Sequence, residues 1–184
     1  MIIRTSACDL DIRIPGDGRT VHGVCVPFDS PALINDRDGR YSETFTRGSF
    51  ARTIRERGAG RVKFLALHDQ RALPLGRATL LREDATGLYG EFRVSQTQSG
   101  DEALELVRDG ALDAFSIGFE PVRNVWAKDM ASVVRAEAKL LEVSVVAFPA
   151  FDGAAIAGVR HREPSLTIPN DIARRRLAVP LETW

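Results

Sequence analysis

Apolar and polar residues alternate with a period of two along much of the chain, which is the pattern of half-buried β-strands. The alternation occurs in LDIRI, in TVHGVCVPF and in LGRATLLREDATGLYGEFRVS, which reads as two strands joined by a turn at residues 84–87. RVKFLALHD predicts a buried strand that ends at His68 and Asp69, and residues 121–151 predict a long hairpin. Short strands therefore dominate the expected fold.

Helical periodicity is limited to a few short segments. The clearest one predicts a helix over residues 99–110, with Ser99 or Asp101 as its N-cap and Gly110 as its end. Its apolar stripe consists of Ala103, Leu104, Leu106 and Val107. A shorter helix is expected over residues 49–57, capped by Ser49. The class is therefore α+β, with a mainly antiparallel sheet or barrel.

The 184 residues are enough for one domain with a substantial core, and we expect it to cover residues 1–160. Residues 161–184 have no lasting periodicity and contain three prolines and an arginine triplet at 174–176. This composition predicts a flexible tail.

Charge and composition exclude several classes of function. Lysine and arginine balance aspartate and glutamate at 25 each, so nothing indicates a nucleic-acid partner. No apolar run approaches the roughly 20 residues of a membrane span, and the N-terminus lacks a signal-peptide layout. Cys8 and Cys25 offer no metal spacing and read as buried thiols in a reducing cytoplasm. The three scattered histidines form no metal motif, and no cofactor is expected.

The segment LDAFSIGFEP contains a candidate nucleophile, Ser116. Strand alternation directs Phe115, Ile117 and Phe119 towards the core and Ser116 to the opposite face. There the hydroxyl lies between Ala114 and Gly118, which leaves room for another group to approach. Ala114 occupies the first glycine position of G-x-S-x-G, so the segment is not the nucleophile elbow of an α/β-hydrolase.

A serine hydroxyl is a poor nucleophile without a base, and His68 is the best candidate because it follows an apolar strand. Histidine, with an ordinary pKa of about 6.5, suits general-base catalysis at neutral pH. Glu142 is an acid inside an apolar strand, on the same face as Ser144, and could orient an imidazole. The alternative interpretation is that Glu142 is an exposed glutamate on an edge strand. The rival acids are Asp69, Asp113 and Glu120.

Six segments in a fixed order carry a resemblance to a known family: VHGVCVPFDSPA, YSETFTRGSF, LALHDQRALPLGRA, TGLYGEFRV, LVRDGALDAFSIGF and LLEVSVVAFPAFDGAAI. Together they strongly resemble the tailed-phage prohead (capsid maturation) proteases over about residues 20–157. The resemblance implies a serine protease with a compact β-barrel flanked by helices, similar to the herpesvirus assembly proteases. It also implies Ser116 as the nucleophile, His68 as the base and Glu142 as the orienting acid.

The same resemblance implies a cellular location and partner proteins. The substrates would be the scaffolding protein, or the scaffolding segment of the major capsid protein, inside the immature procapsid in the host cytoplasm. Self-cleavage is expected in the tail after Arg160, and homodimers are compatible with the herpesvirus relatives. Backbone amides near Gly118, or Arg71, are candidate oxyanion donors. The competing interpretations are a non-catalytic, scaffold-like assembly protein that retains the fold and a general cytoplasmic hydrolase.

Overall fold

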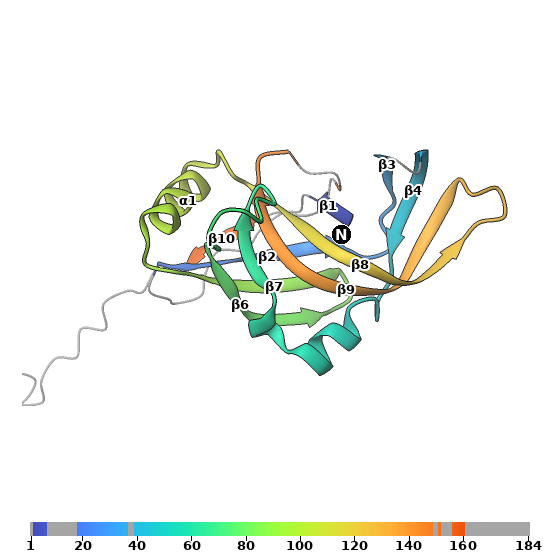
Figure 1. Cartoon of the computed structure of the whole chain (residues 1–184), viewed down its shortest axis with the longest axis horizontal. Helices are drawn as coiled ribbons and strands as arrows, with labels where there is room; N and C mark the ends of the chain where they lie inside the picture. Colours follow the sequence, from blue (N-terminus) through green and yellow to red (C-terminus); the bar gives the residue numbers. More distant parts are fainter. Residues whose placement is uncertain (1, 7–17, 37–38, 149–150, 152–155, 161–184) are drawn as a thin grey trace, which may run out of the picture.

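Strands dominate the computed structural model of the chain, which describes residues 2–6, 18–36, 39–148, 151 and 156–160 (Figure 1). The strands are β1 (Ile2–Ser6), β2 (Thr20–Pro27), β3 (Ala32–Asp36), β4 (Gly39–Phe45), β5 (Lys63–Ala66), β6 (Gly76–Glu83), β7 (Gly87–Val94), β8 (Ala114–Trp126), β9 (Ser132–Val146) and β10 (Ile156–Arg160). The helical elements are the π-helical turn η1 (Thr53–Arg57), the short 3₁₀ turn η2 (Ala59–Arg61) and helix α1 (Gln98–Asp109).

All ten strands belong to one sheet, with the order β1-β8-β9-β5-β6-β7-β2-β10 and with β3 and β4 branching from β9. The pairings of β9 with β4 and with β5 are parallel, and the others are antiparallel. The expected class, mainly antiparallel strands with few helices, is confirmed.

The expected closed barrel is wrong. In the part of the chain that the structure describes, β1 pairs only with β8 and β10 pairs only with β2, so the two ends of the main strand order stay unpaired with each other. Alternation along a strand shows which residues face the core, but it contains no information on whether the last strand returns to the first.

Most predicted elements are present. The turn at residues 84–87 joins β6 to β7, and the long hairpin of β8 and β9 is formed. Helix α1 ends as expected, because Gly110 adopts the left-handed conformation with φ of 80°. Its N-cap is Thr97, whose side chain accepts the N–H of Gly100, and not Ser99 or Asp101. The LDIRI segment and the tail at 161–184 lie outside the described residues, so the domain boundary at 160 stays a prediction.

The helix expected at residues 49–57 is shorter than predicted, and Ser49 does not cap it. The hydroxyl of buried Ser49 lies 2.7 Å from the carbonyl oxygen of Arg135 and so ties this segment to β9. Glu83 of β6 takes the capping role, because its carboxylate accepts the N–H groups of Gly48 and Phe50. Sequence reasoning missed this cap because its acceptor is distant in the chain.

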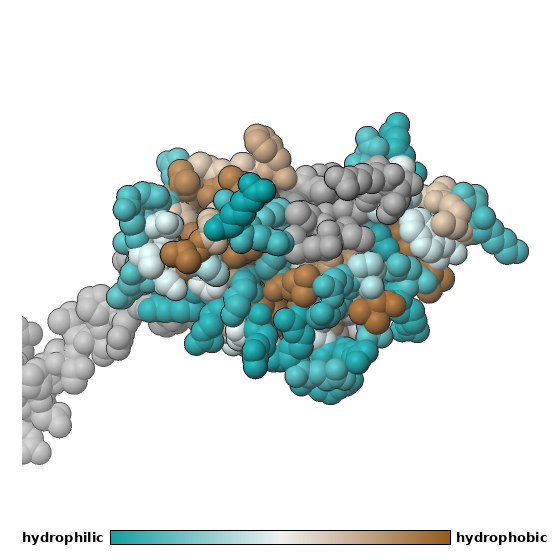
Figure 2. Space-filling view, viewed as in Figure 1, coloured by the Kyte–Doolittle hydropathy of each residue, from teal (hydrophilic) through white to brown (hydrophobic). Residues whose placement is uncertain are grey.

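Aromatic side chains form the centre of the core. Phe64 of β5 stacks on Phe92 of β7 with ring centroids 4.8 Å apart, and Phe92 also contacts Phe115 of β8 at 5.2 Å. These contacts place β5, β7 and β8 around one apolar interior. On the face shown in Figure 2, hydrophilic residues predominate and hydrophobic ones occur in separate patches.

A buried ion pair joins the β3–β4 hairpin to the first half of β9. The Nε of Arg135 lies 2.5 Å from a carboxylate oxygen of Glu43, and both side chains are almost fully buried. The guanidinium also lies 5.9 Å from the ring centroid of Tyr41 and 5.8 Å from that of Trp126. A charge in such a site is stable only while its partner is present.

We expect Glu43→Gln to lower the free energy of unfolding by about 3 kcal/mol, because it leaves the Arg135 charge buried without compensation. The control is Lys139→Met, which breaks the exposed pair of Lys139 with Glu120 and should hardly change stability. Urea denaturation of both variants measures the difference. An equal loss of unfolding free energy in the two variants would contradict the stabilising role of the buried ion pair.

Cys25 lies in β2 with no exposed surface, and burial raises the pKa of its thiol well above the ordinary value. Only the thiolate reacts with alkylating agents. Iodoacetamide at pH 9 should therefore leave Cys25 unmodified in the folded protein and modify it in urea, as peptide mass spectrometry would show. Rapid labelling without denaturant would contradict the buried position.

Candidate active site

Three neighbouring strands supply the three predicted site residues. β9 lies between β8 and β5 in the sheet, and Ser144 of β9 is opposite both Ser116 of β8 and Leu65 of β5. Glu142 precedes Ser144 by two residues and therefore lies on the same face of β9. His68 follows the end of β5, two residues beyond Ala66, where the chain turns back over this face.

The side chains of Ser116, His68 and Glu142 form one hydrogen-bonded row. The Nε2 of His68 lies 2.5 Å from the Oγ of Ser116, and its Nδ1 lies 2.6 Å from the Oε1 of Glu142. Only 12% of the His68 side chain and 5% of the Glu142 side chain are exposed. The structure thus brings the three predicted site residues together.

The order of the row defines the direction of its hydrogen bonds. An ionised carboxylate only accepts hydrogen bonds, so the Nδ1–H of His68 donates to Glu142. In a neutral imidazole the other nitrogen is then an acceptor, and the hydroxyl of Ser116 donates to Nε2. This arrangement can take a proton from Ser116.

Ser144 forms a fourth part of the site that the sequence did not assign. Its hydroxyl donates to the Oε2 of Glu142 at 2.7 Å and accepts the backbone N–H of His68 at 3.1 Å. Ser144 has no exposed surface. The only signal in the sequence was its position on the face of Glu142, two residues away.

The backbone at the end of β5 has an unusual conformation. Leu67 and His68 have φ angles of 50° and 59°, in the left-handed region that residues with a side chain rarely adopt. Two backbone hydrogen bonds hold the turn. The N–H of Leu67 donates to the carbonyl of Val145, and the N–H of Asp69 donates to the carbonyl of Ala66. Strained backbone of this kind is common at functional sites.

The polar face of β8 is less open than the small residues around Ser116 suggested. All residues from Ala114 to Phe119 are buried, and Ser116 is 0% exposed. The imidazole of His68 covers the hydroxyl on one side, and β1 flanks the strand with Thr5 opposite Ser116. Ser116 therefore has no surface open to solvent in this structure.

The rival acids lie in other environments. Asp69 accepts the backbone N–H groups of Arg71 and Ala72 and so stabilises its own loop. Glu120 pairs with Lys139 on the surface, which lowers the pKa of its carboxyl, chiefly through that hydrogen bond. The backbone carbonyl of Asp113 accepts a hydrogen bond from the N–H of Ile156.

His22 is not part of the row. His22 is buried in β2, where its Nδ1 lies 3.2 Å from the hydroxyl of Tyr89. His161 lies outside the described residues. His68 is the histidine whose ring nitrogens lie at hydrogen-bond distance from both Ser116 and Glu142.

The two candidate oxyanion donors receive little support. Gly118 lies within the sheet, opposite Ile3 of β1 and Glu142 of β9, so its backbone groups point at neighbouring strands. Arg71 is exposed, and its backbone N–H donates to Asp69.

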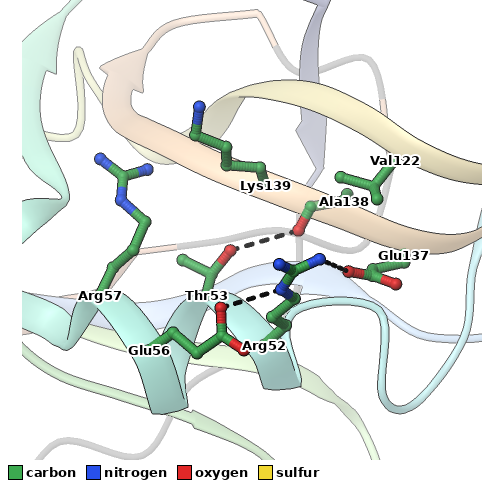
Figure 3. Close-up of a pocket in the computed structure, with 8 residues that line it drawn as sticks. All are labelled: Arg52, Thr53, Glu56, Arg57, Val122, Glu137, Ala138 and Lys139. Carbon is green, nitrogen blue, oxygen red and sulfur yellow. Dashed lines mark hydrogen bonds and ion pairs between the residues drawn. The ribbon is translucent and has the colours of Figure 1, made fainter.

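A separate cavity of about 270 Å³ lies between η1 and the middle of the β8–β9 hairpin (Figure 3). Its charged side chains are already paired: Arg52 contacts Glu56 and Glu137, and Arg57 donates to the carbonyl of Leu140. None of the three predicted site residues lines this cavity. It is therefore distinct from the row at His68.

No cluster of three or more potential metal ligands occurs among the described residues. Within the same part of the chain, no helix has the length and apolarity needed to cross a membrane.

A serine, an imidazole and a carboxylate in a hydrogen-bonded row are the arrangement that serine hydrolases use on several unrelated folds. The chain belongs to the family of caudovirus prohead serine proteases, whose model matches residues 9–167. It is 26% identical to the prohead protease of Enterobacteria phage HK97 over 162 residues, which cover 86% of this chain and 69% of the relative. Its function is proteolysis in phage capsid maturation.

The fold also has a solved counterpart. The capsid assembly protease of bacteriophage T4 matches with a TM-score of 0.56 and 12% identity, over 80% of this chain and 97% of the T4 chain. At this level of identity the match supports the fold alone. It agrees with a sheet-rich protease fold that has few helices.

Proposed function

We propose that Ser116, His68 and Glu142 are the catalytic triad of this protease. The observation that carries the proposal is the continuous hydrogen-bonded row from the Ser116 hydroxyl through His68 to Glu142. The row joins three elements far apart in the sequence, and it combines a nucleophile, a base and an orienting acid.

The reaction is acyl transfer in two halves. The Oγ of Ser116 bonds to the peptide carbonyl carbon while the Nε2 of His68 takes the hydroxyl proton. The C–N bond then breaks, and His68 returns this proton to the leaving amine. In the second half, His68 deprotonates a water molecule that attacks the acyl-enzyme, and Ser116 regains its proton.

Glu142 orients the imidazole and stabilises the imidazolium that forms in each half. Its carboxylate lies 2.6 Å from Nδ1 and is 5% exposed, so little water screens the interaction. The charge remains tolerable in this site because both carboxylate oxygens accept hydrogen bonds.

The proposed substrates are the scaffolding protein, or the scaffolding segment of the major capsid protein, within the immature procapsid in the bacterial cytoplasm. The membership in the prohead protease family supports this choice. Self-cleavage after residue 160 is part of the proposal, since a protease needs extended and accessible chain. A homodimer is compatible with it.

Ser116→Ala should abolish cleavage and leave the fold intact, because it removes one buried oxygen and the nucleophile with it. Co-expression with the capsid and scaffold proteins encoded nearby, followed by intact-mass measurement, compares this variant with wild type. Shortened partners are expected with wild type only.

The alternative is a non-catalytic assembly protein that retains the protease fold. It predicts full-length partners with both wild type and Ser116→Ala, in shells that still form. Labelling by a serine-directed fluorophosphonate separates the two functions further, because only an activated Ser116 reacts. Cleavage by Ser116→Ala at the wild-type rate would remove Ser116 from the mechanism.

Glu142→Gln should lower kcat by roughly 10³–10⁴-fold, because an amide can stabilise the wrong imidazole tautomer and carries no charge to stabilise the imidazolium. Glu137→Gln is the matched control on the same strand, where Glu137 pairs with Arg52 away from His68. The rate of capsid-protein cleavage is measured for both variants. A loss below tenfold in Glu142→Gln would exclude Glu142 as the orienting acid.

A further inference from the structure

We propose that Ser144 is a positioning residue of the protease, which holds both the acid and the base of the triad in place. This inference rests on the proposed roles of Ser116, His68 and Glu142, and it assigns a function to a hydroxyl that those roles leave unexplained.

The contacts of Ser144 close a ring of three hydrogen bonds. Its Oγ donates to the Oε2 of Glu142, and the Oε1 of Glu142 accepts the Nδ1–H of His68. The backbone N–H of His68 donates to the same Oγ of Ser144. The three distances are 2.7, 2.6 and 3.1 Å in that order. The ring therefore constrains the carboxylate plane, the imidazole and the backbone of His68 together.

The first consequence concerns Glu142. With one oxygen on His68 and the other on Ser144, the carboxylate cannot rotate about its last torsion without losing a hydrogen bond. Hydrogen bonds to an ionised group are stronger than those between neutral groups. Ser144 thus keeps Oε1 directed at Nδ1 through its hydrogen bond to Oε2.

The second consequence concerns the turn that presents His68. The parallel pairing of β5 with β9 ends near Ala66 and Val145, and Leu67 and His68 then adopt left-handed φ angles. The N–H of His68 no longer meets a carbonyl of β9 and bonds to the Ser144 side chain instead. This bond offsets part of the strain of two left-handed residues in succession.

Because Ser144 is buried, solvent water does not take over the hydrogen bonds of its hydroxyl. Ser144 is 0% exposed, and Glu142 is 4% exposed. If the hydroxyl is removed, no bulk water takes its place, and both the carboxylate oxygen and the His68 N–H lose a partner.

The test compares Ser144→Ala with Ser49→Ala. Ser49 is a matched control because it is also 0% exposed and its hydroxyl bonds to backbone carbonyls, but it lies at the η1 end of the molecule. Both variants lose a buried hydroxyl, so both should lose stability. Only Ser144→Ala should lose activation of Ser116.

The readout is the rate at which a fluorophosphonate labels Ser116, a step in which the Oγ–P bond forms, fluoride leaves and His68 takes the proton. For Ser144→Ala, the maximal labelling rate should fall about tenfold to a hundredfold while the half-saturating probe concentration stays unchanged. Ser49→Ala should label like wild type at a temperature where both variants are folded. Ser144→Ala labelling within twofold of wild type, or an equal loss in Ser49→Ala, would overturn the inference.

A proton NMR measurement adds a signature independent of turnover. The Nδ1–H proton of His68, identified by its loss in Glu142→Gln, should move or broaden in Ser144→Ala and stay in place in Ser49→Ala. If Ser144→Ala does not fold, Ser144→Cys preserves most of the volume with a weaker donor and should label at an intermediate rate. Wild-type labelling by Ser144→Cys would then overturn the inference.

These outcomes separate the inference from the proposed function. If wild-type protein is not labelled at Ser116, the triad itself fails. If wild type is labelled and Ser144→Ala is labelled equally fast, the triad stands and only the role of Ser144 fails.

Discussion

The parallel pairing of β5 with β9 is the constraint on which the site depends. It places the end of β5 beside Val145, so the chain leaves the sheet directly over the face that carries Glu142 and Ser144. The antiparallel pairing of β9 with β8 places Ser116 on the next strand of the same face. A slip of either register by one residue would turn the side chains to opposite faces and separate the three groups.

Strand β9 carries buried charge contacts near both of its ends, and the structure stabilises each one differently. Near its start, Arg135 meets Glu43 in an ion pair surrounded by aromatic rings. Near its end, Glu142 meets an imidazole and a hydroxyl. The first pair holds a hairpin against the sheet, whereas the second contact includes the imidazole that the proposed mechanism uses as its base. Only the second is suited to acid–base chemistry.

The proposed nucleophile is enclosed in this structure. Ser116 is fully buried, and β1 flanks its strand at the free edge of the sheet. The hydrogen-bonded row from Ser116 to Glu142 is already formed without a peptide, so in the proposed mechanism access to Ser116 is a separate step from its activation.

The sequence by itself determined most of the strands, the helix α1 and its end at Gly110, because alternation, periodicity and left-handed glycine are local properties. The β3–β4 hairpin was not among them, because residues 34–43 are polar and rich in turn residues and predict a loop. It also indicated Ser116, His68 and Glu142 through residue type, position on strands and the family resemblance. Only the tertiary structure decided that the sheet stays open, that Glu83 caps the turn at Phe50, and that Ser144 joins Glu142 to the backbone of His68. Each of these depends on contacts between segments distant in the chain, and local patterns do not encode such contacts.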